Sequence, residues 1–376
     1  MRTGLVSLVI FLVAASVAES AQDEGFALRW GETIPGARVV AVSEQGVSVS
    51  VDGGVPRRIG WHRIRSLPSS FEAEAVPFES IREDAWRASI RLRRGDYIAA
   101  EPLFVSLFQR LAGTDGPGTA HAGAGLARCR LARGAAAEAV APWTRCVRST
   151  ELGQSKLSPD NAASVLAGAP SRLQPGLAPF FAPGQGRGVL AAESVLWPFG
   201  TSELVDAYIA AVACDRHERR WHDPGLSDGV LQQERVRSDT DLLIAIAFTR
   251  HPDALRRELA RAALDRWIET APDSLEAWAV VWSRVAVGRS LVREDDPSLR
   301  AEGVLTLLGV VAAYPDELQR LTALALAEAS DTLLSDGDAL SAEVLRAELR
   351  TRYRGKPAAV GPPDPTLLRY TEEPPP

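Results

Sequence analysis

The stretch WIETAPDSLEAW, residues 267–278, places a predicted helix end, a proline and a new helix start close together. Pro272 cannot continue the hydrogen-bond ladder of an α-helix, so the first helix must stop before it. Asp273 can cap the next helix through its carboxylate. We therefore predict one helix that is closed by Trp267 and another that contains Trp278. A chain that repeats this pattern forms a row of short helical hairpins.

The same pattern recurs along the chain. In AAYPDELQRLTALALAEA, residues 312–329, Pro315 ends one predicted helix and an apolar series begins the next. A turn at Gly337 leads into another helix. Nearer the N-terminus, breaks at Gly95 and Gly134 each separate two helical patterns and lie 39 residues apart. An offset of this size is typical of stacked helical hairpins.

These residues resemble the tetratricopeptide repeat family, whose pattern has a turn glycine, a helix-B alanine and a following aromatic residue. Two sets match it: Gly95, Ala100 and Phe104, then Gly134, Ala139 and Trp143. The resemblance covers residues 81–150 and 239–355 and implies a mainly α fold, a helical-hairpin solenoid whose groove binds a protein or peptide. Four positions depart from the pattern: Trp282 at a small-residue position, Arg289 at a turn glycine, Gly303 at the helix-B alanine, and Arg346 at the aromatic.

The N-terminus predicts export. An apolar run over residues 5–18 follows Arg2, and small residues that could serve for cleavage come after it, so we interpret residues 1–20 as a signal peptide. The run is shorter than the roughly 20 residues that a membrane-spanning helix needs, which makes an uncleaved anchor the alternative. We expect a periplasmic or secreted protein with no integral membrane segment after cleavage.

A short β region is predicted before the helices. Val47, Val49 and Val51 alternate with serines, which is the period of a strand with one buried face. Turn residues divide residues 25–68 into four or five short strands. This predicts a small SH3-like β barrel or an open meander, with Trp61 in its core rather than on a binding surface.

The remaining boundaries follow from composition. We expect TPR-like hairpins over residues 78–150, beginning with a capping box formed by Ser80 and Glu83. A Pro/Gly-rich irregular region follows over residues 151–200, where Phe180 and Phe181 should fasten the chain to a helix. A helical-repeat domain over 201–355 and a disordered tail over 356–376 complete the chain. The net charge of −6 argues against a nucleic-acid partner.

Candidate chemistry is confined to CDRHERRWHD, residues 214–223. Cys214 and His217 have a helical spacing that suits zinc, but His217 and His222 are five residues apart and face different ways on a helix. We therefore expect that none of the three is a metal ligand, and that the protein is not an enzyme and needs no cofactor. The alternative is an enzyme or metal-binding protein with its site around residues 180–225. The three cysteines are expected to be buried thiols.

The family register also predicts a binding surface on the two N-terminal hairpins. The helix-A positions that would line a groove are Arg82, Ser89, Arg93, His121 and Arg128. Guanidinium groups pair with carboxylates in a bidentate way, so we expect an acidic peptide or a free C-terminus as the partner. The alternative is that these arginines are solvated and only cover the helix surface with their stems.

Overall fold

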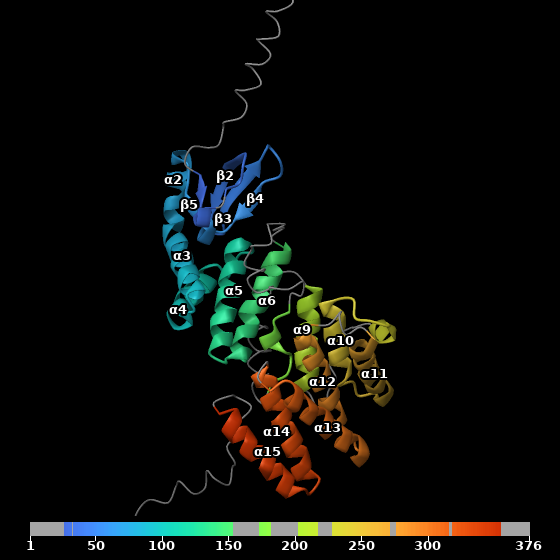
Figure 1. The fold of residues 1–376 in the computed structure, drawn as a ribbon. Coiled ribbons are helices and arrows are strands. Elements are labelled where there is room, and N and C mark those ends of the chain that lie inside the picture. Colours follow the sequence, from blue (N-terminus) through green and yellow to red (C-terminus); the bar gives the residue numbers. More distant parts are fainter. Residues whose placement is uncertain are drawn as a thin grey trace, which may run out of the picture. The chain divides into compact units, whose positions relative to one another are not determined.

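Most of the described chain is helical, in consecutive helices that pack against one another (Figure 1). The computed structural model describes residues 26–31, 33–152, 173–181, 202–216, 228–270, 276–315 and 318–354. The predicted signal peptide, the tail and most of the irregular region lie outside these residues. The chain divides into two compact units, Met1–Cys129 with Arg145–Val165 and Arg130–Thr144 with Leu166–Pro376.

The first unit begins with short antiparallel strands: β1 (Ala27–Leu28), β2 (Ala37–Ser43), β3 (Gly46–Val51), β4 (Arg57–Ile59) and β5 (Ile64–Ser66). β2, β3 and β4 form a three-stranded meander, while β1 pairs only with β5. Among the described strands the two sheets do not join, so a closed SH3-like barrel is not shown, and β2–β4 have the open meander arrangement. Strands of two or three residues at both ends are too short to close a barrel.

The core of this β region follows the predicted alternation. Val47 and Val49 are buried. Trp61 is also buried, and its Nε1 donates to the carbonyl oxygen of Ser43 at 3.0 Å. The prediction that Trp61 belongs to the core is therefore confirmed. Gln45, in the β2–β3 turn, accepts from Thr119 N at 2.9 Å, which joins the sheet to the helices that follow.

Four helices follow in the chain: α2 (Ser69–Ala75), α3 (Glu79–Arg93), α4 (Tyr97–Arg110) and α5 (Pro117–Ala132), with α6 (Ala136–Leu152) after them. The predicted capping box at Ser80 and Glu83 is wrong. α3 begins at Glu79 without a capping side chain, because α2 and a short 3-10 turn lead directly into it. The break at Gly95 is confirmed: its φ is 75°, and Asp96 then caps α4 by accepting from Ala99 N.

The repeat positions of these helices are buried as the family pattern implies. Ala100 and Phe104 in α4, and Ala139 and Trp143 in α6, have no exposed surface. A side chain at Gly125 of α5 would place its Cβ 2.2 Å from the Phe104 ring. Glycine therefore lets α4 and α5 approach closely.

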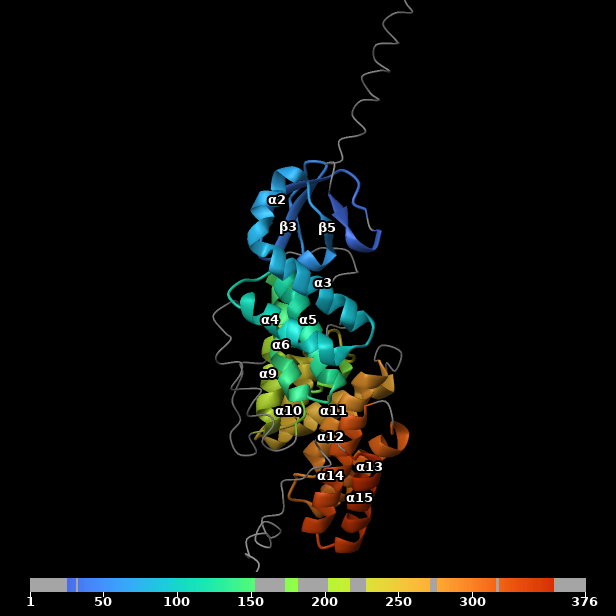
Figure 2. The same cartoon turned by 90° about the vertical axis from the view of Figure 1, so that its left-hand side faces the viewer.

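The second unit contains a row of helices: α9 (Glu203–Arg216), α10 (Asp239–Phe248), α11 (Ala254–Thr270), α12 (Ala277–Leu291), α13 (Pro297–Ala313), α14 (Gln319–Ser335) and α15 (Ala339–Arg352). Each packs against the next in the chain, as Figure 2 shows for α12 to α15. α12 also contacts α10 and α14, so these three alternate helices share a layer.

The opening stretch lies between α11 and α12. Trp267 is buried near the end of α11, and Trp278 lies in the first turn of α12, as predicted. Pro272 and Asp273 fall outside the described residues. Arg289, which departs from the family's turn glycine, lies inside a helix, because α12 continues to Leu291 and the next helix is capped by Asp296.

Candidate functional site

The residues predicted to line a partner groove come from two helices of the first unit. Arg82, Ser89 and Arg93 lie on α3, and His121 and Arg128 on α5. The structure brings the middle of this set together: Ser89 Oγ lies 2.9 Å from His121 Nε2 and donates to the Ala85 carbonyl at 2.6 Å. Arg128 lies about two helical turns beyond His121 and is partly buried.

His121 stacks on a second histidine, for which the sequence analysis predicts no role. His62 comes from the 3-10 turn η2 (Trp61–Arg63) of the β region. The two ring centroids are 3.6 Å apart and the rings are nearly parallel. Burial lowers the pKa of His121 to about 4, and burial, with His121 and two arginines nearby, holds the pKa of His62 well below its usual range. Both imidazoles are therefore neutral at pH 7.

Arg93 is engaged in a ladder of rings and guanidinium groups. The Arg93 guanidinium lies 3.6 Å from the ring centroid of Trp30, whose ring is 4.8 Å from that of Trp86. Arg29 lies 3.9 Å from the Trp86 ring on the same ladder. Trp30, in η1 (Arg29–Gly31), has a φ of 70°, a conformation that costs a non-glycine residue free energy.

Arg82 also contacts the β region. Its guanidinium pairs with Glu79 at 3.2 Å and donates to the carbonyl oxygen of Arg65 in β5. The α3 face that carries Arg82, Ser89 and Arg93 is thus partly covered by the protein's own N-terminal strands and turns. Partner binding through these residues stays a prediction.

A second candidate site lies in the other unit, and the sequence predicted only that its two phenylalanines attach the chain to a helix. Residues 173–181, with the sequence LQPGLAPFF, form what we call the buried segment. Phe180 and Phe181 are buried, as are Leu173, Leu177 and Ala178. The segment contains the 3-10 turn η4 (Pro175–Leu177), after which Ala178 is extended, with φ −51° and ψ 138°. Proline at position 179 favours that conformation in the residue before it.

Three residues hold the buried segment, and we call them the segment-binding residues: Trp282 and Arg289 of α12 and Arg320 of α14. Arg320 Nη2 donates to the Ala178 carbonyl at 2.9 Å, and Nη1 to the Phe180 carbonyl. Trp282 Nε1 donates to the Pro175 carbonyl at 3.3 Å.

The two phenylalanine rings meet the same arginines. Arg289 lies 5.4 Å from the ring centroid of Phe180, and Arg320 lies 5.1 Å from that of Phe181. Arg289 is itself almost fully buried and pairs with Glu328 of α14 at 2.6 Å, which neutralises its charge. The expectation that the phenylalanines fasten the irregular region to a helix is confirmed.

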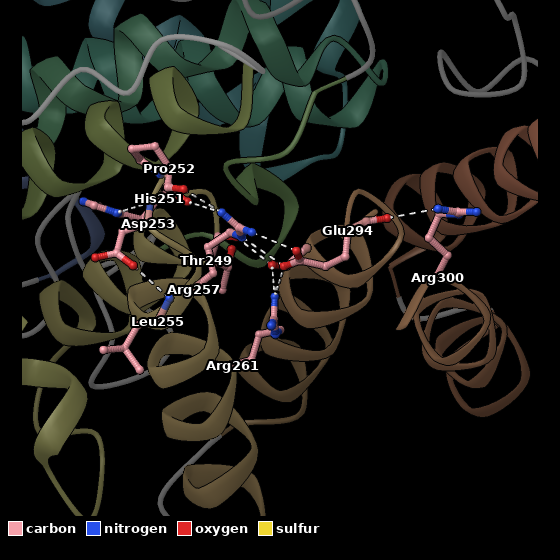
Figure 3. A network of polar contacts seen from close by, with 10 residues as sticks. Thr249, His251, Pro252, Asp253, Leu255, Arg257, Arg261, Glu294 and Arg300 are labelled. Atoms are coloured by element: carbon pink, nitrogen blue, oxygen red, sulfur yellow. Dashed lines mark hydrogen bonds and ion pairs between the residues drawn. The ribbon is translucent and has the colours of Figure 1, made fainter. Parts of the chain in front are cut away.

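A polar network of the same unit joins α11 to the residues between α12 and α13 (Figure 3). Arg257 binds Glu294 through two hydrogen bonds of 2.9 and 2.8 Å, and Arg261 donates to the same carboxylate at 2.6 Å. These hydrogen bonds lower the pKa of Glu294 and raise that of Arg257. A carboxylate held by two guanidinium groups is a poor base. We therefore interpret the network as structural, because it connects α11 with the residues between α12 and α13.

The metal-capable stretch yields no site. Cys214 is buried near the end of α9, whereas His217 and His222 lie outside the described residues. Within the described ranges, no three His, Cys, Asp or Glu side chains are grouped to hold a metal ion. All three cysteines are buried thiols, as predicted, and burial raises the pKa of Cys146 to about 12.

Two of the segment-binding residues were visible in the sequence as departures from the repeat pattern. Trp282 occupies a small-residue position and Arg289 a turn-glycine position, and both contact the buried segment. Arg320 carried no such signal. Of the helices that the structure describes, none is both long and apolar enough to cross a membrane. No family model, curated protein or solved structure matches the chain.

Proposed function

We propose that the chain is an exported, non-enzymatic helical-repeat scaffold that binds a protein partner as an extended peptide. The binding surface in this proposal is the layer formed by α10, α12 and α14, and the hairpins of α10 to α15 are degenerate tetratricopeptide-like repeats. Export rests on the signal-like N-terminus alone. The single observation that carries the binding function is the way α12 and α14 hold residues 173–181.

Three features support peptide binding on this layer. The hydrogen bonds from Arg320 and Trp282 go to backbone carbonyls, which every peptide offers. The aromatic rings lie against guanidinium groups, an attraction worth about 0.5–2 kcal/mol for each pair. The contacts come from neighbouring helices of one layer, which is where repeat proteins present their binding surfaces.

The competing function, an enzyme or metal-binding protein with a site around residues 180–225, gains no specific observation. The part of this region that the structure describes supplies a buried thiol at Cys214 and two buried rings at Phe180 and Phe181. Its carboxylates at Glu203 and Asp206 are exposed in the first turn of α9. The scaffold is therefore the function that the geometry favours.

Capture of partners from a cell-envelope fraction of the source organism tests the proposal. The full chain and its Arg320→Ala variant are cross-linked to bound proteins, which are then quantified by mass spectrometry. We expect the Arg320→Ala variant to capture at least about tenfold less of the specific partner than the wild type does. The substitution removes two carbonyl contacts at about 1 kcal/mol each.

Arg350→Ala is the matched control. Arg350 is an exposed arginine of α15 that pairs with Glu343, and it does not belong to the segment-binding residues. Its variant should capture partners as the wild type does. Equal capture by the Arg320→Ala variant and the wild type, with both folded, would contradict the proposal.

A further inference from the structure

We infer that residues 173–181 are an intramolecular ligand: they occupy the site at which a partner's uncharged, proline-containing extended segment with adjacent aromatic residues would bind. This inference rests on the proposed function and adds to it the chemistry of the partner and its regulation. The buried segment is then a competitor that is built into the chain.

The backbone contacts of the buried segment are those of a bound peptide. Arg320 binds the carbonyl oxygens of Ala178 and Phe180, which lie on either side of Pro179 in the chain. Ala178 has the polyproline II conformation and precedes a proline. An extended segment of this kind is already ordered before it binds, so binding costs it less conformational entropy.

Side chains of the buried segment define the class of partner. The sequence LQPGLAPFF has no charged residue, and its adjacent aromatic residues follow the first proline by five and six positions. The charge of Arg289 is neutralised by Glu328, and the donors of Arg320 are used on carbonyls. Both amino groups of Arg320 and the charge of Arg289 are thus already engaged, so the site favours neutral aromatic side chains over an acidic peptide.

Covalent attachment makes even a weak segment an effective competitor. A tethered ligand has an effective concentration of about 1 mM, so a segment with an intrinsic Kd of about 10–100 µM weakens a competing peptide by about 10- to 100-fold. Replacing the two phenylalanines of the segment should restore most of the affinity for the competing peptide. The effect can be measured with purified components.

The probe is a fluorescein-labelled peptide with the sequence LQPGLAPFF, added in trans and followed by fluorescence anisotropy. We expect the wild-type chain to bind it with a Kd of about 1 mM or weaker, because its own segment fills the site. The full-chain variant Phe180→Ala/Phe181→Ala should bind it at least tenfold more tightly. Adding Arg320→Ala to that variant should abolish the gain, and the peptide LQPGLAPSS should not bind.

Folding is controlled in two ways, because both phenylalanines are buried. Circular dichroism and a cooperative thermal transition must show that the double variant is folded. Phe181→Leu, which keeps most of the buried volume but loses the contact with Arg320, should give an intermediate gain. Phe104→Ala, a buried aromatic truncation in the other unit, should give none.

The outcomes separate this inference from the proposed function. A folded double variant and a folded Phe181→Leu variant that both bind the probe no better than wild type would overturn the intramolecular ligand. If partner capture nevertheless depended on Arg320, the scaffold function would stand without it. If the variants gained probe binding but partner capture did not depend on Arg320, the intramolecular ligand would be supported. The proposal that this site binds an envelope partner would then be contradicted.

Discussion

The face of α3 and the layer of α12 and α14 are both covered by another part of the same chain, but in different ways. The α3 face meets the folded β region through stacked histidines and a ladder of arginine and tryptophan side chains. The α12–α14 layer meets the buried segment through backbone carbonyls and through its two phenylalanine rings. The first contact depends on particular side chains held by a folded module, whereas the second also uses backbone groups that any peptide carries.

This difference indicates which surface is suited to exchange its occupant. A side-chain interface such as that of His62 and His121 requires the whole β region to leave as one body. The buried segment has to release its carbonyl contacts with Arg320 and Trp282 and the buried side chains of residues 173–181. Contacts with backbone carbonyls can be taken over by another peptide, so we propose the C-terminal layer as the partner-binding surface.

The largest expected effect concerns the anchor of the C-terminal layer. Trp282→Ala removes a fully buried indole and should lower the free energy of unfolding of its unit by about 3–5 kcal/mol. Trp278→Ala is the matched control, because Trp278 is partly exposed, packs edge-on against Trp282 at 4.8 Å and donates to Glu276 Oε2. Its loss should be on the order of 1 kcal/mol. Urea unfolding followed by circular dichroism measures both, and equal losses would show that the layer is not organised around Trp282.

The next effect concerns the histidine stack of the first unit. Because burial lowers the pKa of His121 to about 4 and that of His62 well below normal, both imidazoles stay neutral while the unfolded chain takes up protons below about pH 6.5. Stability should therefore be complete above pH 6.5 and fall as the pH drops toward 4, by at most roughly 3 kcal/mol for His121.

Urea unfolding at pH 7, 5.5 and 4.5 checks this pH dependence. The variant His62→Gln/His121→Gln should lose less stability between pH 7 and 4.5 than the wild type does, since glutamine does not titrate. The difference between the two slopes isolates the histidines from the carboxylates, which contribute to both. Parallel slopes would mean that the stacked rings are protonated in the folded protein at the same pH as in the unfolded one.

Sequence reasoning reached the local features of the fold and missed the contacts between distant segments. The turns at Gly95, Gly134 and Gly337 were predictable, because each has a positive φ that favours glycine. The capping box at Ser80 failed because α2 and the 3-10 turn after it run directly into α3. Burial of Phe180 and Phe181 was predictable, because they are adjacent large apolar side chains in a stretch rich in proline and glycine.

The binding contacts themselves were not predictable. Trp282 and the Pro175 carbonyl that it binds are 107 residues apart, and no spacing rule connects positions at that distance. Only the departure of Trp282 and Arg289 from the repeat pattern gave a signal. Similarly, nothing in the sequence placed His62 on His121 or Trp30 beneath Arg93. In a degenerate repeat, the positions that break the pattern are therefore the first to examine for a ligand.

The smallest expected effect concerns the predicted N-terminal surface. The variant Arg93→Glu/Arg128→Glu should remain folded, with a loss of about 1 kcal/mol from the contact between Arg93 and Trp30. If the surface binds an acidic partner, capture should fall, and more at low salt, where exposed charges are screened less. The control is Arg87→Glu/Arg110→Glu, which changes the charge by the same amount at arginines paired with Glu83 and Asp84.

The result decides between the two surfaces. Capture that falls in the Arg93→Glu/Arg128→Glu variant but not in the control would mean that part of the α3 face remains open to a partner despite the β region. Unchanged capture, with the small loss of stability, would mean that Arg93 serves to hold Trp30 and that the β region has taken the place of a ligand there. Partner binding would then depend on the C-terminal layer, where the occupant is a segment that a peptide can replace.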